Sequence, residues 1–99
     1  MSREDSQAHA SRELQACRQE LENLDLDLVQ LLARRLSIAR RTGGLKRASG
    51  MPILDPQREA AVIRQAVSHA RKLGVPEEPV REIFWHIVGL SRRAQEETE

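Results

Sequence analysis

Cationic side chains stand in the first half of the chain at positions where helical periodicity predicts apolar ones. Arg35 and Thr42 interrupt a stripe of apolar residues spaced three and four positions apart. Lys46 follows Arg35 by eleven residues, which is about three helical turns and returns it to nearly the same face. Burying a charge costs free energy unless the charge is paired or binds a group of opposite sign, so these positions require a chemical explanation.

The same departure from apolar periodicity occurs in two further segments. Near the C-terminal end, Ser91 and Gln95 continue a helical face that is apolar before them. Arg58 and Glu59 stand one turn ahead of another apolar face, shortly after Asp55. Each residue alone has an ordinary explanation as a surface, capping or frayed side chain. Because three segments show the departure, we expect these side chains to converge on one polar site.

The converging side chains suit the recognition of a small, doubly negative molecule. Arginine forks bind carboxylates through paired hydrogen bonds. The predicted site combines cations, carboxylate acceptors and neutral hydrogen-bonding groups, which are respectively Arg35, Arg58 and Lys46, then Asp55 and Glu59, then Ser91 and Gln95. This set fits a dianion that also carries a hydroxyl group.

Other kinds of site find less support in the sequence. No glycine-rich phosphate loop is present, and His9, His69 and His86 lack metal-ligand spacing, so we expect neither a metal nor a cofactor. Ser91 has no evident His–Asp support, which argues against nucleophilic catalysis. The formal net charge of +1 argues against a nucleic-acid partner.

The composition indicates a small cytoplasmic protein. The 99 residues allow one domain, and 39% are hydrophobic and 31% charged, which is ordinary for a soluble helical chain. Cys17 is the only cysteine, so an internal disulfide is excluded and a reducing compartment is expected. We find no long apolar run and no apolar signal region, and therefore expect no membrane association.

The first element that positions the polar residues is a long helix. We expect a disordered or frayed N-terminus over residues 1–10 and one all-helical domain over 11–97. Uninterrupted periodicity predicts a helix from about Ser11 to about Ala48, on the order of 55 Å long. A compact monomer of 100 residues has a radius of gyration of roughly 13 Å, so two short helices cannot cover this rod. We therefore expect a homodimer in which two long helices pack together.

Two shorter helices follow the break SGMPILDP. Asp55 as N-cap and Pro56 at the first helical position predict a helix that ends at Gly74. Pro76 opens a third helix. The predicted apolar faces consist of Val62, Ile63, Ala66, Val67, Ala70 and Leu73 in the second helix and of Val80, Ile83, Phe84, Ile87 and Val88 in the third.

Arg18 adds a geometric argument for the dimer. It precedes Arg35 by seventeen residues, or about 25 Å along one helix, and cannot share a small site with Arg35 of its own chain. An antiparallel partner could supply Arg18 to that site. Taken alone, Arg18 has the character of an ordinary surface arginine.

The sequence resembles the all-helical chorismate mutases, the AroQ class. The resemblance extends from about Leu14 to Gln95 and rests on the segments CRQELENLDLDLVQLLARR, GGLK, PILDPQRE and SRRAQ, which are specific only in combination. It implies an intertwined homodimer of three-helix chains, in which one arginine of the other chain completes each site. It also implies the Claisen rearrangement of chorismate to prephenate, without a cofactor, in phenylalanine and tyrosine biosynthesis.

The resemblance implies catalytic roles for Arg35, Lys46, Glu59 and Gln95. Arg35 binds one substrate carboxylate, and the partner chain contributes Arg18 to bind the other. Lys46 and Gln95 flank the ether oxygen whose bond breaks. The rearrangement requires no proton transfer, so catalysis rests on holding a chair-like conformer and on donors aimed at the charge growing on that oxygen.

The remaining contacts follow from the same resemblance. Asp55 and Glu59 meet the ring hydroxyl region, while Arg58 and Ser91 complete the carboxylate and polar contacts. Thr42 and Arg92 depart from the family pattern, because both are more polar than the residues expected at those positions. These two departures could modify affinity or substrate choice.

Three alternatives remain open at this point. Isochorismate-pyruvate lyases share the fold, but tend to carry apolar residues at the positions of Asp55 and Glu59. A 4-amino-4-deoxychorismate mutase acts on a substrate with an amine in place of the hydroxyl, and Asp55 and Glu59 could serve that amine at least as well. A non-catalytic helical interaction module would explain the long stripe and the paired arginines, but leaves Gln95 and Glu59 unexplained.

Overall fold

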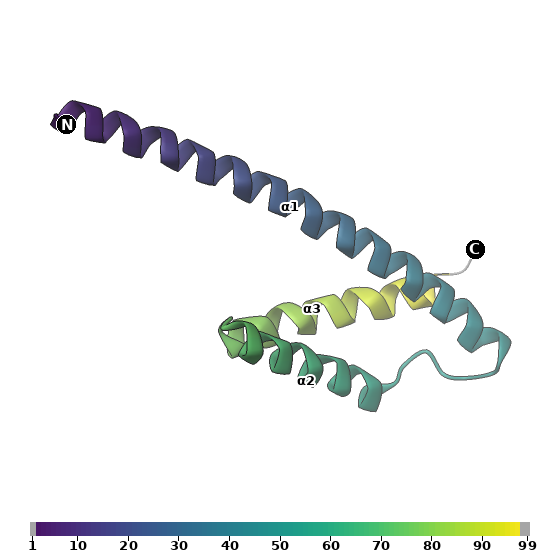
Figure 1. Cartoon of the computed structure of the whole chain (residues 1–99). Coiled ribbons are helices and arrows are strands. Elements are labelled where there is room, and N and C mark those ends of the chain that lie inside the picture. The colour runs from purple at the N-terminus through teal and green to yellow at the C-terminus, as the bar shows by residue number, and fades with distance from the viewer. Residues whose placement is uncertain (1, 98–99) are drawn as a thin grey trace. The chain divides into compact units, whose positions relative to one another are not determined.

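The computed structural model describes residues 2–97, which form three helices and no strand. Helix α1 spans Arg3–Ala48, α2 spans Pro56–Leu73 and α3 spans Glu77–Glu96 (Figure 1). The predicted all-α class is therefore confirmed for this part of the chain. None of the three helices combines the length and the apolar character that crossing a bilayer would require.

The chain divides between Ala33 and Arg34 into two units, of which the first contains only the beginning of α1. This helix starts at Arg3, eight residues before its predicted start. The backbone N–H of Asp5 donates to Ser2 Oγ over 3.1 Å, which is the contact of a helix N-cap. Acidic side chains in the first turn are favourable beside the positive end of a helix. The expectation of a frayed segment over 1–10 is thus wrong for residues 3–10, and Met1 lies outside the described residues.

The predicted apolar stripe in the first unit is exposed within this chain. Its leucines are each more than half accessible to solvent, namely Leu14, Leu21, Leu24, Leu28 and Leu31. Soluble proteins rarely leave a continuous apolar face of this kind open to water. These leucines therefore form an apolar face on α1, but they are not part of the hydrophobic core of the single chain.

Helix α2 has the boundaries that its local signals predict. Asp55 is the N-cap, and its Oδ1 accepts the backbone N–H of Arg58 over 3.0 Å. Pro56 occupies the first helical position, where its missing N–H costs nothing. At the other end Gly74 adopts a left-handed conformation with φ 71°, in which glycine avoids a Cβ clash.

The core of the second unit is small and built mainly from short side chains. Helices α2 and α3 lie side by side (Figure 1) and contribute most of the buried residues, which are Ile63, Ala66, Val67 and Ala70 with Val88 and Ala94. Two members of the predicted faces are exposed to solvent. Leu73, the last residue of α2, is 78% exposed, and Ile83 of α3 is 55% exposed.

Gly43 allows the end of α1 to touch the backbone of α3. A Cβ built on Gly43 would lie 2.7 Å from the Cα of Gln95 and 2.8 Å from its carbonyl carbon. Backbone atoms cannot move aside as a flexible side chain can, so only glycine fits here. A Cβ on the neighbouring Gly44 would meet nothing closer than the Arg47 Nη2 atom at 4.0 Å.

This contact predicts opposite effects for two adjacent substitutions. Gly43→Ala should lower the free energy of unfolding by about 1–3 kcal/mol, the usual cost of overpacking. Gly44→Ala should raise it by about 0.5–1 kcal/mol, because alanine loses less backbone entropy in a helix. Urea denaturation followed by circular dichroism measures both values. Equal effects of the two changes would contradict a close approach specific to Gly43.

Candidate active site

A pocket of about 410 Å³ opens in the second unit, where the last turns of α1, the beginning of α2 and the end of α3 meet. Its apolar wall includes Ile38, Val62 and Val88. Its lining includes every residue that one chain was predicted to contribute, namely Arg35, Lys46, Asp55, Arg58, Glu59, Ser91 and Gln95. The structure thus brings together side chains that span sixty positions of the sequence.

Arg35 and Ser91 form one hydrogen-bonded pair among these pocket residues. The Arg35 guanidinium is partly buried and donates from Nη1 to the hydroxyl of Ser91, which is 7% exposed. Burial, and secondly the charge of Arg58, lower the pKa of Arg35. A guanidinium nevertheless stays protonated in proteins and carries five N–H donors. Arg35 can therefore hold Ser91 and still offer donors to a carboxylate.

Lys46 and Gln95 form a second pair. The Lys46 ammonium donates to Gln95 Oε1 over 2.8 Å and to the backbone carbonyl of Ile53 over 3.0 Å. An ammonium has three N–H groups, so one remains for a ligand. Because the amide oxygen of Gln95 faces Lys46, its NH₂ group is left as a donor. Two donors of different charge thus stand next to each other in the pocket.

The acids of the pocket are each engaged by the protein. Asp55 uses Oδ1 to cap α2, as described above, so its second oxygen is not needed for the cap. Glu59 binds Arg92 through both oxygens, with distances of 2.8 Å from Nε and 2.6 Å from Nη2. Hydrogen bonds from Arg92 are the largest cause of a lowered pKa of Glu59, and burial acts in the opposite direction.

The ion pair between Glu59 and Arg92 is a contact that the sequence reasoning did not anticipate. In the sequence, Arg92 stands out as a departure from the family pattern and not as a partner of Glu59. The pair could have been predicted from the opposite charges of Arg92 and Glu59, because the two helices that carry them were expected to converge. Thr42, the other departure, lines the pocket and donates its hydroxyl to the Ile38 carbonyl over 2.9 Å, which satisfies that group within its own helix.

Arg18 lies in the first unit, on α1, where it is exposed. Its assignment to a site formed with another chain therefore remains a prediction. Across residues 2–97, no cluster of three or more His, Cys, Asp or Glu side chains could hold a metal ion.

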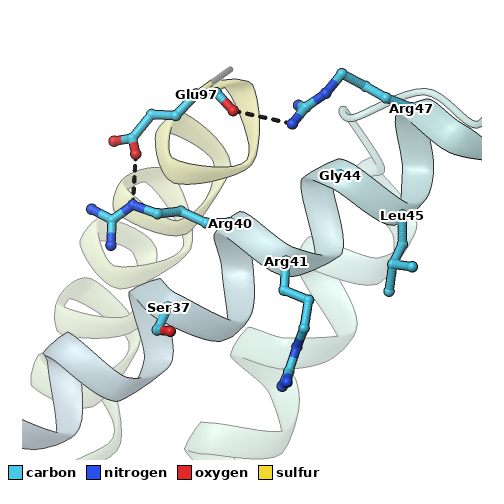
Figure 2. A pocket seen from close by; sticks show the side chains of 7 residues that line it. All are labelled: Ser37, Arg40, Arg41, Gly44, Leu45, Arg47 and Glu97. Carbon is cyan, nitrogen blue, oxygen red and sulfur yellow. Dashed lines mark hydrogen bonds and ion pairs between the residues drawn. The ribbon is translucent and has the colours of Figure 1, made fainter. Parts of the chain in front are cut away.

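A larger depression of about 640 Å³ also contains arginines (Figure 2). Arg40 donates to the Glu97 carboxylate over 2.6 Å, and Arg47 donates to the backbone carbonyls of Gln95 and Glu97 over 2.6 and 3.1 Å. The last carbonyls of a helix lack partners within it, so Arg47 caps the end of α3. These cations hold the segment that carries Gln95, whereas Arg35 and Lys46 in the smaller pocket have N–H groups beyond those used in their contacts with the protein.

The fold and the smaller pocket define a class of protein, namely a helical protein with a pocket that carries more cationic than acidic side chains. Three cations and two acids line one cavity, and Ser91 and Gln95 add neutral hydrogen-bonding groups. Paired arginines favour carboxylates as the negative groups of the ligand.

Comparison with known proteins identifies the family. The family model described as chorismate mutase type II matches residues 17–96. The T-protein of Enterobacter agglomerans is 33% identical over 76 residues, which cover 77% of this chain and 20% of the T-protein. The T-protein of Haemophilus influenzae is 33% identical over 71 residues, or 72% of this chain and 19% of that protein.

A 3-dehydroquinate dehydratase of Pyrobaculum aerophilum is 45% identical over 53 residues, which cover 54% of this chain and 18% of the dehydratase. The chain therefore spans about a fifth of the length of these curated relatives. The chain belongs to the chorismate mutase type II family, and the family expected from the resemblance is confirmed.

The Glu59–Arg92 pair predicts a pH-dependent contribution to stability. A group whose pKa is lowered on folding stabilises the fold above its unfolded pKa and loses that contribution as the pH falls through the folded value. Lys46 also lowers the pKa of Glu59 from its ordinary value of 4.5, whereas Asp55 raises it. The difference in Tm between wild type and Glu59→Gln should therefore be largest near neutral pH and shrink as the pH falls below 4.5.

Thermal denaturation between pH 7 and pH 3 measures this difference. Glu82→Gln removes the same charge from an exposed position of α3 and is the matched control. A Tm difference for Glu59→Gln that stayed constant over this range would contradict a stabilising ion pair.

Proposed function

We propose that the chain catalyses the Claisen rearrangement of chorismate to prephenate, a step of phenylalanine and tyrosine biosynthesis. The observation that carries the proposal is the Lys46–Gln95 pair, joined over 2.8 Å in the pocket that also contains Arg35 and Arg58. Chorismate is a dicarboxylate enol ether with a ring hydroxyl. Membership of the chorismate mutase type II family supports this choice of substrate.

The proposed mechanism requires neither a proton donor nor a cofactor. Within the substrate the ether C–O bond breaks while a C–C bond forms, and negative charge grows on the ether oxygen. The third N–H of Lys46 and the NH₂ of Gln95 would stabilise this charge, because preorganised donors act strongest where charge develops. Arg35 and Arg58 would bind the carboxylates and hold the reactive conformer. The unused oxygen of Asp55 and the carboxylate of Glu59 would accept the ring hydroxyl.

We further propose that the active form is a cytoplasmic homodimer in which the partner chain contributes Arg18. The exposed leucine stripe of α1 supports this assembly, since a second copy would remove it from water. The small core of the second unit also favours association, because short chains bury little apolar surface alone. Cys17 is unpaired and exposed, in keeping with a reducing compartment.

The substitution Lys46→Ala tests the catalytic proposal. It should lower kcat by about 100- to 1,000-fold, which is the usual loss on removing one donor from a developing anion. Loss of chorismate absorbance measures the rate, and circular dichroism checks the helices. Lys72→Ala, at the exposed end of α2, is the matched control and should retain wild-type activity. Near-normal turnover by Lys46→Ala would refute the assigned role.

Wild-type protein should be assayed in parallel with chorismate, isochorismate and 4-amino-4-deoxychorismate. Conversion of chorismate to prephenate is expected. Pyruvate release from isochorismate would instead indicate a lyase. Absence of turnover with all three substrates would favour a non-catalytic interaction module.

Mixing two inactive variants tests the shared site. Arg18→Ala and Arg35→Ala are each expected to be inactive as homodimers. Random subunit exchange at equal concentrations makes half of the dimers mixed, and one of the two sites in each mixed dimer regains both arginines. The mixture should therefore recover about a quarter of wild-type activity. A mixture no more active than its components would show that Arg18 and Arg35 do not cooperate across chains.

A further inference from the structure

Arg92 makes two hydrogen bonds to Glu59 of the pocket, although it does not line the pocket itself. Its Nε and Nη2 atoms each bind one oxygen of Glu59, in the parallel geometry that gives arginine–carboxylate pairs their strength and direction. The side chain of Glu59 is 21% exposed and that of Arg92 is 35% exposed, so water screens the pair only in part. Glu59 is therefore the residue of the pocket through which Arg92 can influence a ligand.

The pair changes what Glu59 can offer a ligand. An ionised carboxylate has about four lone-pair positions, and Arg92 occupies two of them. The others can still accept a hydrogen bond from a neutral hydroxyl. The attraction of Glu59 for a cation is reduced, however, because the Arg92 guanidinium is in contact with the same carboxylate. Glu59 is thus an acceptor whose negative charge is already balanced.

The rest of the pocket does not restore an attraction for a cation. The other acid, Asp55, uses one oxygen to hold the N-terminus of α2. The cations Arg35, Lys46 and Arg58 line the same cavity and repel positive charge. A positively charged group placed beside Glu59 would therefore meet repulsion with little compensation.

We infer that Arg92 determines substrate specificity, because its pairing with Glu59 makes the site favour a ring hydroxyl over a ring ammonium at the same position. The inference rests on the proposed function, since it concerns substrates that share the enol-ether skeleton of chorismate. An alkyl amine on that ring is protonated at neutral pH, so chorismate and 4-amino-4-deoxychorismate differ by one positive charge at this position.

The ratio of kcat/KM for chorismate to kcat/KM for 4-amino-4-deoxychorismate tests the inference. Arg92→Leu removes the balancing charge and should lower this ratio by about tenfold relative to wild type, which corresponds to losing or gaining one charged hydrogen bond. The change should appear mainly as a lower KM for the amine. Arg92→Lys keeps the charge with a single contact and should restore most of the wild-type ratio.

Arg93→Leu is the matched control, because it removes the same charge from the exposed neighbouring position of α3. It should leave the ratio unchanged. If Arg92→Leu also leaves the ratio unchanged, or if it lowers both kcat/KM values equally, Arg92 is only structural and the inference is overturned. Should Arg92→Leu fail to fold, Arg92→Gln keeps a neutral donor of similar length and must show the same fall in the ratio.

The outcomes also separate this inference from the proposed function. A wild-type protein that converts neither substrate overturns both. A wild-type protein that converts chorismate, with a ratio insensitive to Arg92, leaves the proposed function in place and overturns the inference alone.

Discussion

The close approach of α1 and α3 at Gly43 is the constraint on which the pocket depends. The backbone of Gln95 rests against Gly43, three residues before Lys46. This places the amide of Gln95 within 2.8 Å of the Lys46 ammonium. A side chain at position 43 would separate the two helices and with them the two donors. The geometry of the site thus rests on the absence of one methyl group rather than on a large packed core.

Several charged residues of the pocket share one arrangement, in which each is held by hydrogen bonds to another group of the protein. Residues that face the cavity retain hydrogen-bonding capacity, while their protein partners fix their orientation. Ser91 orients Arg35, the Ile53 carbonyl and Gln95 orient Lys46, and Arg92 orients Glu59. Partly buried charges that are held in this way cost less free energy than isolated ones. The arrangement suits a reaction that is accelerated by preorganised charge rather than by proton transfer.

Much of this arrangement could be predicted from local signals in the sequence. Asp55, Pro56 and Gly74 act within one helical turn, so they fix the ends of α2 without reference to the rest of the chain. Periodicity likewise placed Arg35 and Lys46 on one face of α1. The start of α1 was missed because polar residues without periodicity resemble a frayed end, whereas one hydrogen bond to Ser2 begins the helix.

The features that could not be predicted depend on how the helices are rotated against one another. The Glu59–Arg92 contact requires α2 and α3 to present particular faces, and periodicity does not state which of two polar neighbours on α3 reaches Glu59. Which side chains of a helix are buried depends on the same rotation and on how much of the helix length is covered by its neighbours. Ile83 therefore belongs to the apolar pattern of α3 and yet remains outside the core.

The end of α3 links the site to the ionic composition of its surroundings. Gln95 lies one residue before the helix ends at Glu96, where backbone hydrogen bonds open most readily. Its carbonyl is held by Arg47, and the next turn of chain is tied to α1 by the exposed Arg40–Glu97 pair. Dissolved salt weakens exposed ion pairs of this kind. The order of the Gln95 amide is therefore coupled to ionic strength through contacts of Arg40 and Glu97, which do not line its pocket.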